Sequence, residues 1–68
     1  MYLMRIDTPV RVIKDTYFHT PKGSEGVIMY LFPPGEYGEG SGLLYSVLFG
    51  NSYRVLFREH ELEEIDGD

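Results

Sequence analysis

Apolar and polar residues alternate on both sides of a short turn in the last third of the chain. The turn is Gly50-Asn51-Ser52, and the alternating apolar positions around it are Tyr45, Val47, Phe49, Tyr53, Val55 and Phe57. Period-two alternation on either side of a Gly-Asn turn is typical of a β-hairpin. The sequence therefore predicts two antiparallel strands, over Leu43–Phe49 and Ser52–Phe57.

The length of this turn decides which side chains of the hairpin are buried. A shift of one residue in the pairing moves every side chain of a strand to the other face. A loop with an odd number of residues places both alternating rows on one face, because it pairs Val47 with Val55 and Tyr45 with Phe57. We therefore expect a three-residue loop or an equivalent bulge. The outer face of the hairpin then carries Leu44, Ser46, Leu48, Arg54 and Leu56.

Three further segments have the composition of strands. Pro9 begins the run Val10–Lys14, and a proline at the first position of a strand removes no ladder hydrogen bond. Glu25–Phe32 is apolar on both faces, as expected for a strand that bends across a barrel, and Gly26 permits the bend. After the hairpin, one helical turn over Arg58–Glu61 leads to a last strand that returns Leu62 and Ile65 to the core.

Two segments between these strands have loop composition. Residues 15–24 contain Pro21 and Gly23, and residues 33–42 contain two prolines and four glycines. The second segment is expected to be a long flexible connector in which nothing packs, with Tyr37 exposed at its centre as a contact anchor. Residues 1–7 alternate weakly, which is compatible with an added edge strand or with a frayed end.

Five short strands, a long second loop and a helical turn before the last strand predict an all-β fold, namely a small five-stranded SH3-like barrel. An open β-meander of four strands is the alternative. In both, the predicted core consists of Val10, Val12, Ile28, Tyr30, Val47, Phe49, Val55, Phe57 and Leu62. We expect residues 1–68 to form a single domain, with an N-terminal segment (1–8), the barrel (9–65) and an acidic tail end (66–68).

The composition excludes several classes of protein. The chain has no cysteine, which excludes a disulfide scaffold, a thiol nucleophile and an iron–sulfur or zinc site built on cysteine. The apolar runs have the length of strands rather than of membrane spans, and the N-terminus lacks the pattern of a signal peptide. We expect a cytoplasmic protein, or a stromal one if it is organellar.

The net charge of −5 is concentrated near the end of the chain. Six of the eleven acidic residues lie within the last ten positions, whereas residues 1–58 hold six bases against five acids. The body of the domain is therefore nearly neutral and lacks the dense basic stripe of a protein that binds phosphate backbones. An acidic terminus of this kind is most simply a solvated end.

No arrangement of residues indicates catalysis. His19 and His60 are the two histidines, and neither belongs to a metal-binding pattern with three or four ligands at fixed spacing. The serines lie in no nucleophile motif, and acids gathered in a tail form poor acid–base pairs. We expect no enzymatic activity, no metal and no cofactor. Binding of proline-rich peptides is also disfavoured, because the chain has no tryptophan.

Nucleic-acid binding is the alternative function for a small barrel. The binding surface would be a patch of cations beside the stacking ring of Tyr53 or Tyr17, formed by Arg5, Arg11, Lys14, Lys22, Arg54 and Arg58. The six bases are scattered, however, and the acidic tail would repel phosphate. A related alternative is an acidic inhibitor or antirepressor whose tail mimics nucleic acid.

Several short motifs resemble the variable subunit of ferredoxin–thioredoxin reductase. Over residues 10–65, these motifs are Val10-Arg11-Val12, the residues Tyr17, His19 and Pro21, then Glu25-Gly26, and the ending Tyr53–Arg58 followed by Glu61-Leu62. The ending is also similar to small barrel subunits of photosystem I and of the photosynthetic NADH-dehydrogenase-like complex. The resemblance implies an SH3-like barrel without catalytic groups that docks on a larger redox assembly. The segment between His19 and Gly26 is shorter than in the reductase subunit.

These observations favour a non-catalytic accessory subunit or protein-interaction module that docks on and stabilises a larger protein, for which a redox enzyme is a candidate. The predicted surface is the outer face of the closing hairpin, with an apolar centre and a polar rim. Its predicted residues are Leu44, Leu48, Leu56, Arg54, Arg58 and Tyr37. In the alternative interpretation, the connector or the N-terminal segment folds over the leucines and makes them part of a satellite core.

Overall fold

Five antiparallel strands form a single sheet in this computed structural model, which describes residues 3–50 and 52–65. The elements are β1 (Pro9–Val12), β2 (Glu25–Phe32), β3 (Leu44–Phe49), β4 (Arg54–Phe57), the 3-10 turn η1 (Glu59–Glu61) and β5 (Leu62–Glu64). The described part of the chain contains no other helix. The all-β prediction and the helical turn before the last strand are confirmed. The predicted tail end, residues 66–68, lies outside the described residues, as does Asn51 of the turn.

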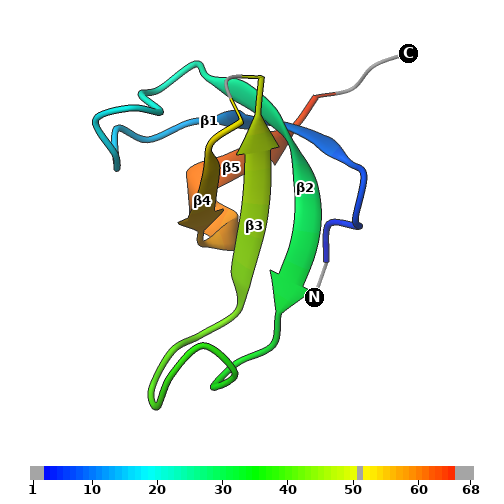
Figure 1. The fold of residues 1–68 in the computed structure, drawn as a ribbon, viewed down its shortest axis with the longest axis vertical. Helices are drawn as coiled ribbons and strands as arrows, with labels where there is room; N and C mark the ends of the chain where they lie inside the picture. Colours follow the sequence, from blue (N-terminus) through cyan, green and yellow to red (C-terminus); the bar gives the residue numbers. More distant parts are fainter. Residues whose placement is uncertain (1–2, 51, 66–68) are drawn as a thin grey trace.

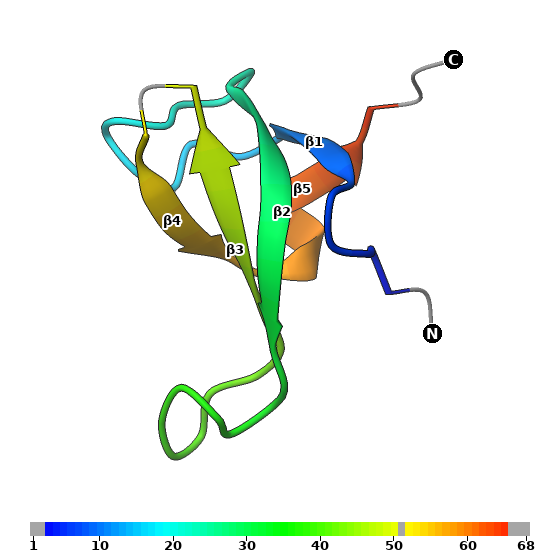
Figure 2. The ribbon, with the colours of Figure 1, turned by 45° about the vertical axis from the view of Figure 1, so that its right-hand side comes forward.

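The order of strands in the sheet is β4-β3-β2-β1-β5, so the last strand lies beside the first and the sheet is not a four-stranded meander. The sheet is strongly curved (Figures 1 and 2). Because of this curvature, side chains from all five strands meet in one core cluster. Its buried members are Met4, Val10, Val12, Ile28, Tyr45, Val47, Phe49, Phe57 and Leu62, and Val55 packs against them.

The β3–β4 hairpin has the predicted register. Val47 pairs with Val55 and Tyr45 pairs with Phe57. The amide of Phe49 donates to the carbonyl of Tyr53 at 2.9 Å, so three residues of the sequence separate the two bonded positions, as predicted. Both rows therefore contribute to the inner face, as the turn length requires, except that Tyr53 beside the turn is 44% exposed.

Tyr30 does not lie in the core, and its predicted burial was wrong. Ile28 pairs with Val47, but Tyr30 pairs with the next residue, Ser46, so β2 contains a β-bulge between Ile28 and Tyr30. The extra residue shifts the alternation of the strand by one position. Tyr30 is consequently 45% exposed on the outer face, while Leu31 takes the inner position and packs against the core.

The segment before β1 is fixed to the sheet without forming a strand in its described part. Met4 is buried, and its amide donates to the Tyr45 hydroxyl at 3.2 Å. The amide of Asp7 donates to the carbonyl of Ile28 at 2.7 Å, next to the bulge. This segment therefore closes one end of the core rather than covering the outer face of the hairpin.

The loop between β1 and β2 lies against β4, an edge strand of the sheet. The Tyr17 hydroxyl donates to the backbone carbonyl of Leu56 at 2.8 Å, and its ring packs edge-to-face on Phe57 at 5.3 Å. An edge strand presents unpaired backbone groups that can join another chain. Tyr17 satisfies one of these groups and covers part of the edge.

We expect the substitution Tyr17→Phe to lower the free energy of unfolding by about 1 kcal/mol, since it removes one hydrogen bond. Burial, together with the charge of Glu61, raises the pKa of the Tyr17 phenol above its ordinary value. The unfolded chain therefore ionises first as pH rises past about 10, and the fold loses stability there. In urea unfolding, the free energy of unfolding of Tyr17→Phe should therefore fall less between pH 7 and pH 10.5 than that of the unmodified chain. Equal alkaline losses in both proteins would contradict the prediction, and the exposed-residue variant Tyr37→Phe is the control.

Candidate functional site

The outer face of β2, β3 and β4 is the side of the sheet that points away from the core cluster. The pairings place on it Val27, Tyr30, Phe32, Leu44, Ser46, Leu48, Arg54 and Leu56. The core cluster contains none of these described residues. Antiparallel sheets commonly expose one face that is polar, so the apolar character of this face is the main feature of the surface.

The three predicted leucines share this face but differ in exposure. Leu44 is only 9% exposed, and it lies on the interior strand β3 next to its cross-strand partner Phe32. Leu48 and Leu56 are half-buried, and Arg54 beside them is exposed. The accessible apolar centre is therefore formed by Leu48 and Leu56, with little contribution from Leu44.

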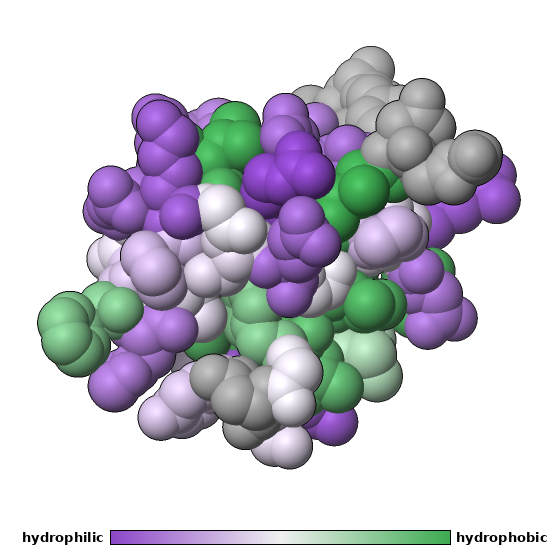
Figure 3. All heavy atoms as spheres, turned by 90° about the horizontal axis from the view of Figure 1, so that it is seen from above, coloured by the Kyte–Doolittle hydropathy of each residue, from purple (hydrophilic) through white to green (hydrophobic). Residues whose placement is uncertain are grey.

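A shallow apolar groove continues the outer face towards β1 and β5. Its lining residues are Pro9, Glu25, Gly26, Val27, Leu48, Phe49, Gly50 and Ile65. A view onto this end of the sheet shows apolar side chains gathered between polar ones (Figure 3). The amide of Ile65 donates to the carbonyl of Pro9 at 3.0 Å. This bond keeps Ile65 beside Pro9, where both line the groove. Ile65 is half-buried and does not belong to the core cluster, so its predicted return to the core was wrong.

Sequence reasoning missed Pro9 and Val27 as residues of this surface. Pro9 precedes the buried Val10 in β1, and Val27 precedes the buried Ile28 in β2. Each lies one position from a core residue, so the alternation of the strands would have placed both on the outer face.

An aromatic cluster lies at the other end of the outer face. Its members are Tyr30, Phe32 and Tyr37, with ring centroids 4.7 Å apart for Tyr30 and Phe32 and 5.5 Å apart for Phe32 and Tyr37. Both pairs are edge-to-face, with interplanar angles of 72° and 69°. Tyr37 is 61% exposed, as predicted for a contact anchor on the connector.

The connector projects beyond the ends of β2 and β3 and is folded on itself (Figures 1 and 2). The amide of Gly35 donates to the carbonyl of Ser41 at 2.8 Å, and the amide of Ser41 donates to the carbonyl of Gly38 at 3.0 Å. Its contact with the sheet is the edge-to-face packing of Tyr37 on Phe32. The expectation that nothing in the connector packs was wrong, because the sequence did not reveal an aromatic partner at the end of β2.

Arg58 lies where β4 ends and is exposed. One of its guanidinium nitrogens is 3.3 Å from the position that a Cβ atom on Gly42 would occupy. Its amide donates to the Glu61 carboxylate at 2.8 Å, which caps the η1 turn. Together with Arg54, it places positive charge along the β4 margin of the outer face.

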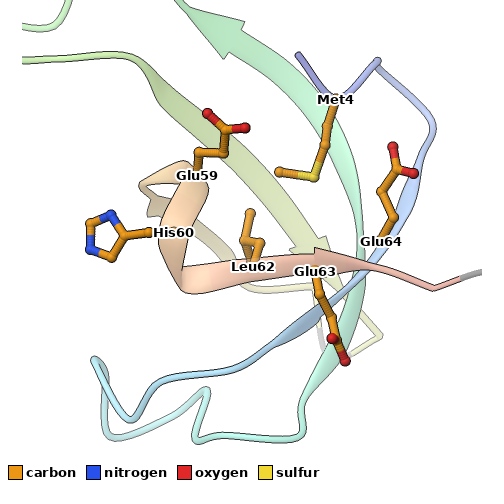
Figure 4. A pocket seen from close by; sticks show the side chains of 6 residues that line it. All are labelled: Met4, Glu59, His60, Leu62, Glu63 and Glu64. Atoms are coloured by element: carbon orange, nitrogen blue, oxygen red, sulfur yellow. The ribbon is translucent and has the colours of Figure 1, made fainter. Parts of the chain in front are cut away.

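A second depression, of about 570 Å³, lies between the N-terminal segment and β5. Its lining residues are Met4, Glu59, His60, Leu62, Glu63 and Glu64. Met4 and Leu62 point towards each other, whereas the imidazole of His60 points away (Figure 4). Glu63 is ion-paired with Arg11 at 2.7 Å. The polar groups do not converge on one point, so the depression offers no geometry for acid–base chemistry.

The two histidines lie on different elements of the fold. The ring of His19 is 5.3 Å from that of Tyr53 and 5.1 Å from that of Phe18, which is 90% exposed. His60 belongs to η1. Within residues 3–50 and 52–65, no three His, Cys, Asp or Glu side chains are grouped closely enough to hold a metal ion.

No helix in the described part of the chain is long and apolar enough to cross a membrane. Comparisons of the sequence and the structure with protein-family models, curated proteins and solved structures give no match.

Proposed function

We propose that this protein is a non-catalytic interaction module that docks on a larger protein through the outer face of β2, β3 and β4. The observation that supports the proposal is that both faces of this one sheet are apolar. The inner face forms the core cluster, and the outer face carries half-buried Val27, Leu48 and Leu56. Contiguous apolar surface of this kind on a small domain marks an interaction site.

The arrangement of polar groups around the face fits the same proposal. Arg54 and Arg58 follow the β4 margin, and small Ser46 lies between Leu48 and Leu44 along β3. An apolar centre with charged groups at its edge is the usual anatomy of a protein–protein interface. The arginines would add specificity and rate of association rather than most of the affinity.

The nature of the partner is proposed from the fold and the sequence motifs together. A sheet with β5 beside β1, and a 3-10 turn between β4 and β5, is what an SH3-like barrel requires, and we propose this architecture for the domain. The motifs that resemble the ferredoxin–thioredoxin reductase variable subunit make a redox enzyme the first partner to test. Fold alone does not determine function, so the test must identify the partner directly.

Exchange of Leu48 and Leu56 for serine in one variant should abolish capture of the partner while the domain stays folded. The tagged chain would be expressed in its native host, purified by affinity and analysed by mass spectrometry, with circular dichroism as the check on folding. Capture that depends on these leucines should persist after nuclease treatment of the lysate, whereas capture mediated by nucleic acid should be lost.

The matched control is Phe18→Ser, which removes an apolar side chain that is 90% exposed but lies on the loop between β1 and β2. This variant should capture the partner as the unmodified chain does. If the double serine variant remains folded and keeps its partner, the outer face is not the docking surface. If it unfolds, Leu48 and Leu56 are part of the core.

A further inference from the structure

The bulge in β2 determines what the outer face displays at its connector end. Without the bulge, the alternation of the strand would place Tyr30 inside, as the sequence pattern predicts. With it, Tyr30 lies on the same face as Phe32 and beside the ring that Tyr37 contacts. Bulges commonly re-aim a side chain towards a functional surface. The result is a corner where three aromatic rings meet.

The three rings keep aromatic surface open to solvent. Tyr30 is 45% exposed and Tyr37 is 61% exposed. Both contact Phe32 edge-to-face, so neither ring is covered by a stacked neighbour within the cluster. The face of an aromatic ring carries negative potential and attracts cations.

Carboxylates border the same corner. The Glu36 carboxylate accepts a hydrogen bond from the Tyr30 hydroxyl at 3.5 Å, and Glu39 follows Tyr37 by two residues on the connector. The connector, residues 33–42, contains these two acids and no lysine or arginine, and the whole chain has a net charge of −5. The guanidinium group of Arg58, which follows β4, lies beside Gly42 at the other end of the connector from Phe32.

We propose that the aromatic cluster receives a positively charged side chain of the partner, an arginine or a lysine, against the rings of Tyr30 and Tyr37 and beside the carboxylate of Glu36. This inference rests on the proposed docking function and names the chemistry that the partner contributes. The alkyl part of such a side chain lies over Phe32, and its charge meets the ring faces and the carboxylate. The net charge of −5, most of it in the last ten residues, also attracts a basic partner at long range.

The test is an NMR titration of the full ¹⁵N-labelled chain. The probe is a twelve-residue glycine–serine peptide with three spaced arginines, and its control has citrulline at the same positions, which keeps the shape and removes the charge. The arginine peptide should shift the amide resonances of Tyr30, Phe32 and Tyr37 in a saturable manner. The citrulline peptide should bind about two- to fivefold more weakly, the factor expected for an exposed cation–aromatic contact.

Variants locate the site. Tyr37→Ala should weaken binding of the arginine peptide by a similar factor of about two to five, and Tyr37→Phe should retain it because the ring face remains. Phe18→Ala, which removes an exposed ring elsewhere, should change nothing. The inference is overturned if the citrulline peptide binds as tightly, if Phe18→Ala weakens binding as much as Tyr37→Ala, or if the shifted resonances lie outside the cluster.

The titration uses no partner protein, so it separates this inference from the docking proposal. One outcome is that the arginine peptide shifts none of the cluster resonances while exchange of Leu48 and Leu56 still abolishes capture of the partner. In that case the outer face is the docking surface and only the proposed cation site is wrong. If the cluster binds arginine but the leucine variant keeps its partner, the docking surface is wrong and the cation site stands on its own.

Discussion

Replacement of Phe57 by alanine should leave the protein largely unfolded at 25 °C. Phe57 is fully buried, and its ring contacts those of Tyr17 at 5.3 Å and Phe49 at 6.0 Å. Truncation of a buried phenylalanine costs about 3–5 kcal/mol. A chain of 68 residues has a free energy of unfolding of about 3–10 kcal/mol in total. The loss is therefore comparable to the whole stability of the domain.

The measurement is the dispersion of the amide NMR spectrum together with a guanidinium unfolding curve. Phe18→Ala, which removes the same side chain at a position that is 90% exposed, should change the free energy of unfolding by less than about 0.5 kcal/mol. A Phe57→Ala protein with a dispersed spectrum and a midpoint near that of the unmodified chain would show that the core lies elsewhere.

Gly26→Ala should lower the free energy of unfolding by about 1–3 kcal/mol, the range for overpacking of a well-filled core. A Cβ atom on Gly26 would lie 2.6 Å from the backbone oxygen of Leu48 and 2.8 Å from a methyl group of Val47. Neither neighbour can withdraw easily, because both belong to β3, which is paired on one side with β2 and on the other with β4. The glycine is needed for close approach of β2 and β3, in addition to the bend that its sequence position suggests.

Gly50→Ala is the matched control, since a Cβ atom there would meet nothing within 4 Å. Thermal and urea unfolding of the two variants should therefore differ clearly, with Gly50→Ala close to the unmodified chain. Equal stabilities would mean that β2 and β3 can separate locally at no cost.

The hairpin could be predicted from sequence because its information is local. The turn and the two alternating rows lie within 13 residues, and only one loop parity buries both rows, so Val47 had to pair with Val55. β2 was predicted with its observed bounds, Glu25–Phe32, for a related reason: polar or glycine-rich segments border an apolar run of strand length.

The exposure of Tyr30 and the course of the N-terminal segment could not be predicted in this way. A bulge cannot be recognised in a strand sequence that is apolar on both faces, because the pattern does not show which alternate residues face the core. Met4 is held by the hydroxyl of Tyr45, a residue 41 positions away. Contacts between such distant residues follow from the assembled sheet and not from any local pattern.

Some residues of the candidate surface could be predicted from local sequence pattern and others could not. Leu48 and Leu56 followed from the hairpin register, and Tyr37 followed from its place in a glycine-rich connector. The neighbours that complete the surface, Tyr30 and Ile65, were assigned to the core instead. Both errors concern residues near a bulge or beyond the last paired strand, where alternation no longer reports the side of the sheet.

The pairing of β5 with β1 has a consequence for the synthesis of the chain. Val12 is made early but finds its partner Leu62 only after 49 intervening residues have been joined, as the register of the two strands requires. Until then, the edge of β1 that pairs with β5 is unpaired and the core lacks the side chain of Leu62. Non-local pairing of this kind slows folding and lengthens the exposure of apolar segments. Folding of the domain should therefore be completed only after residue 64 has left the ribosome, and stalled chains that end before β5 should bind chaperones.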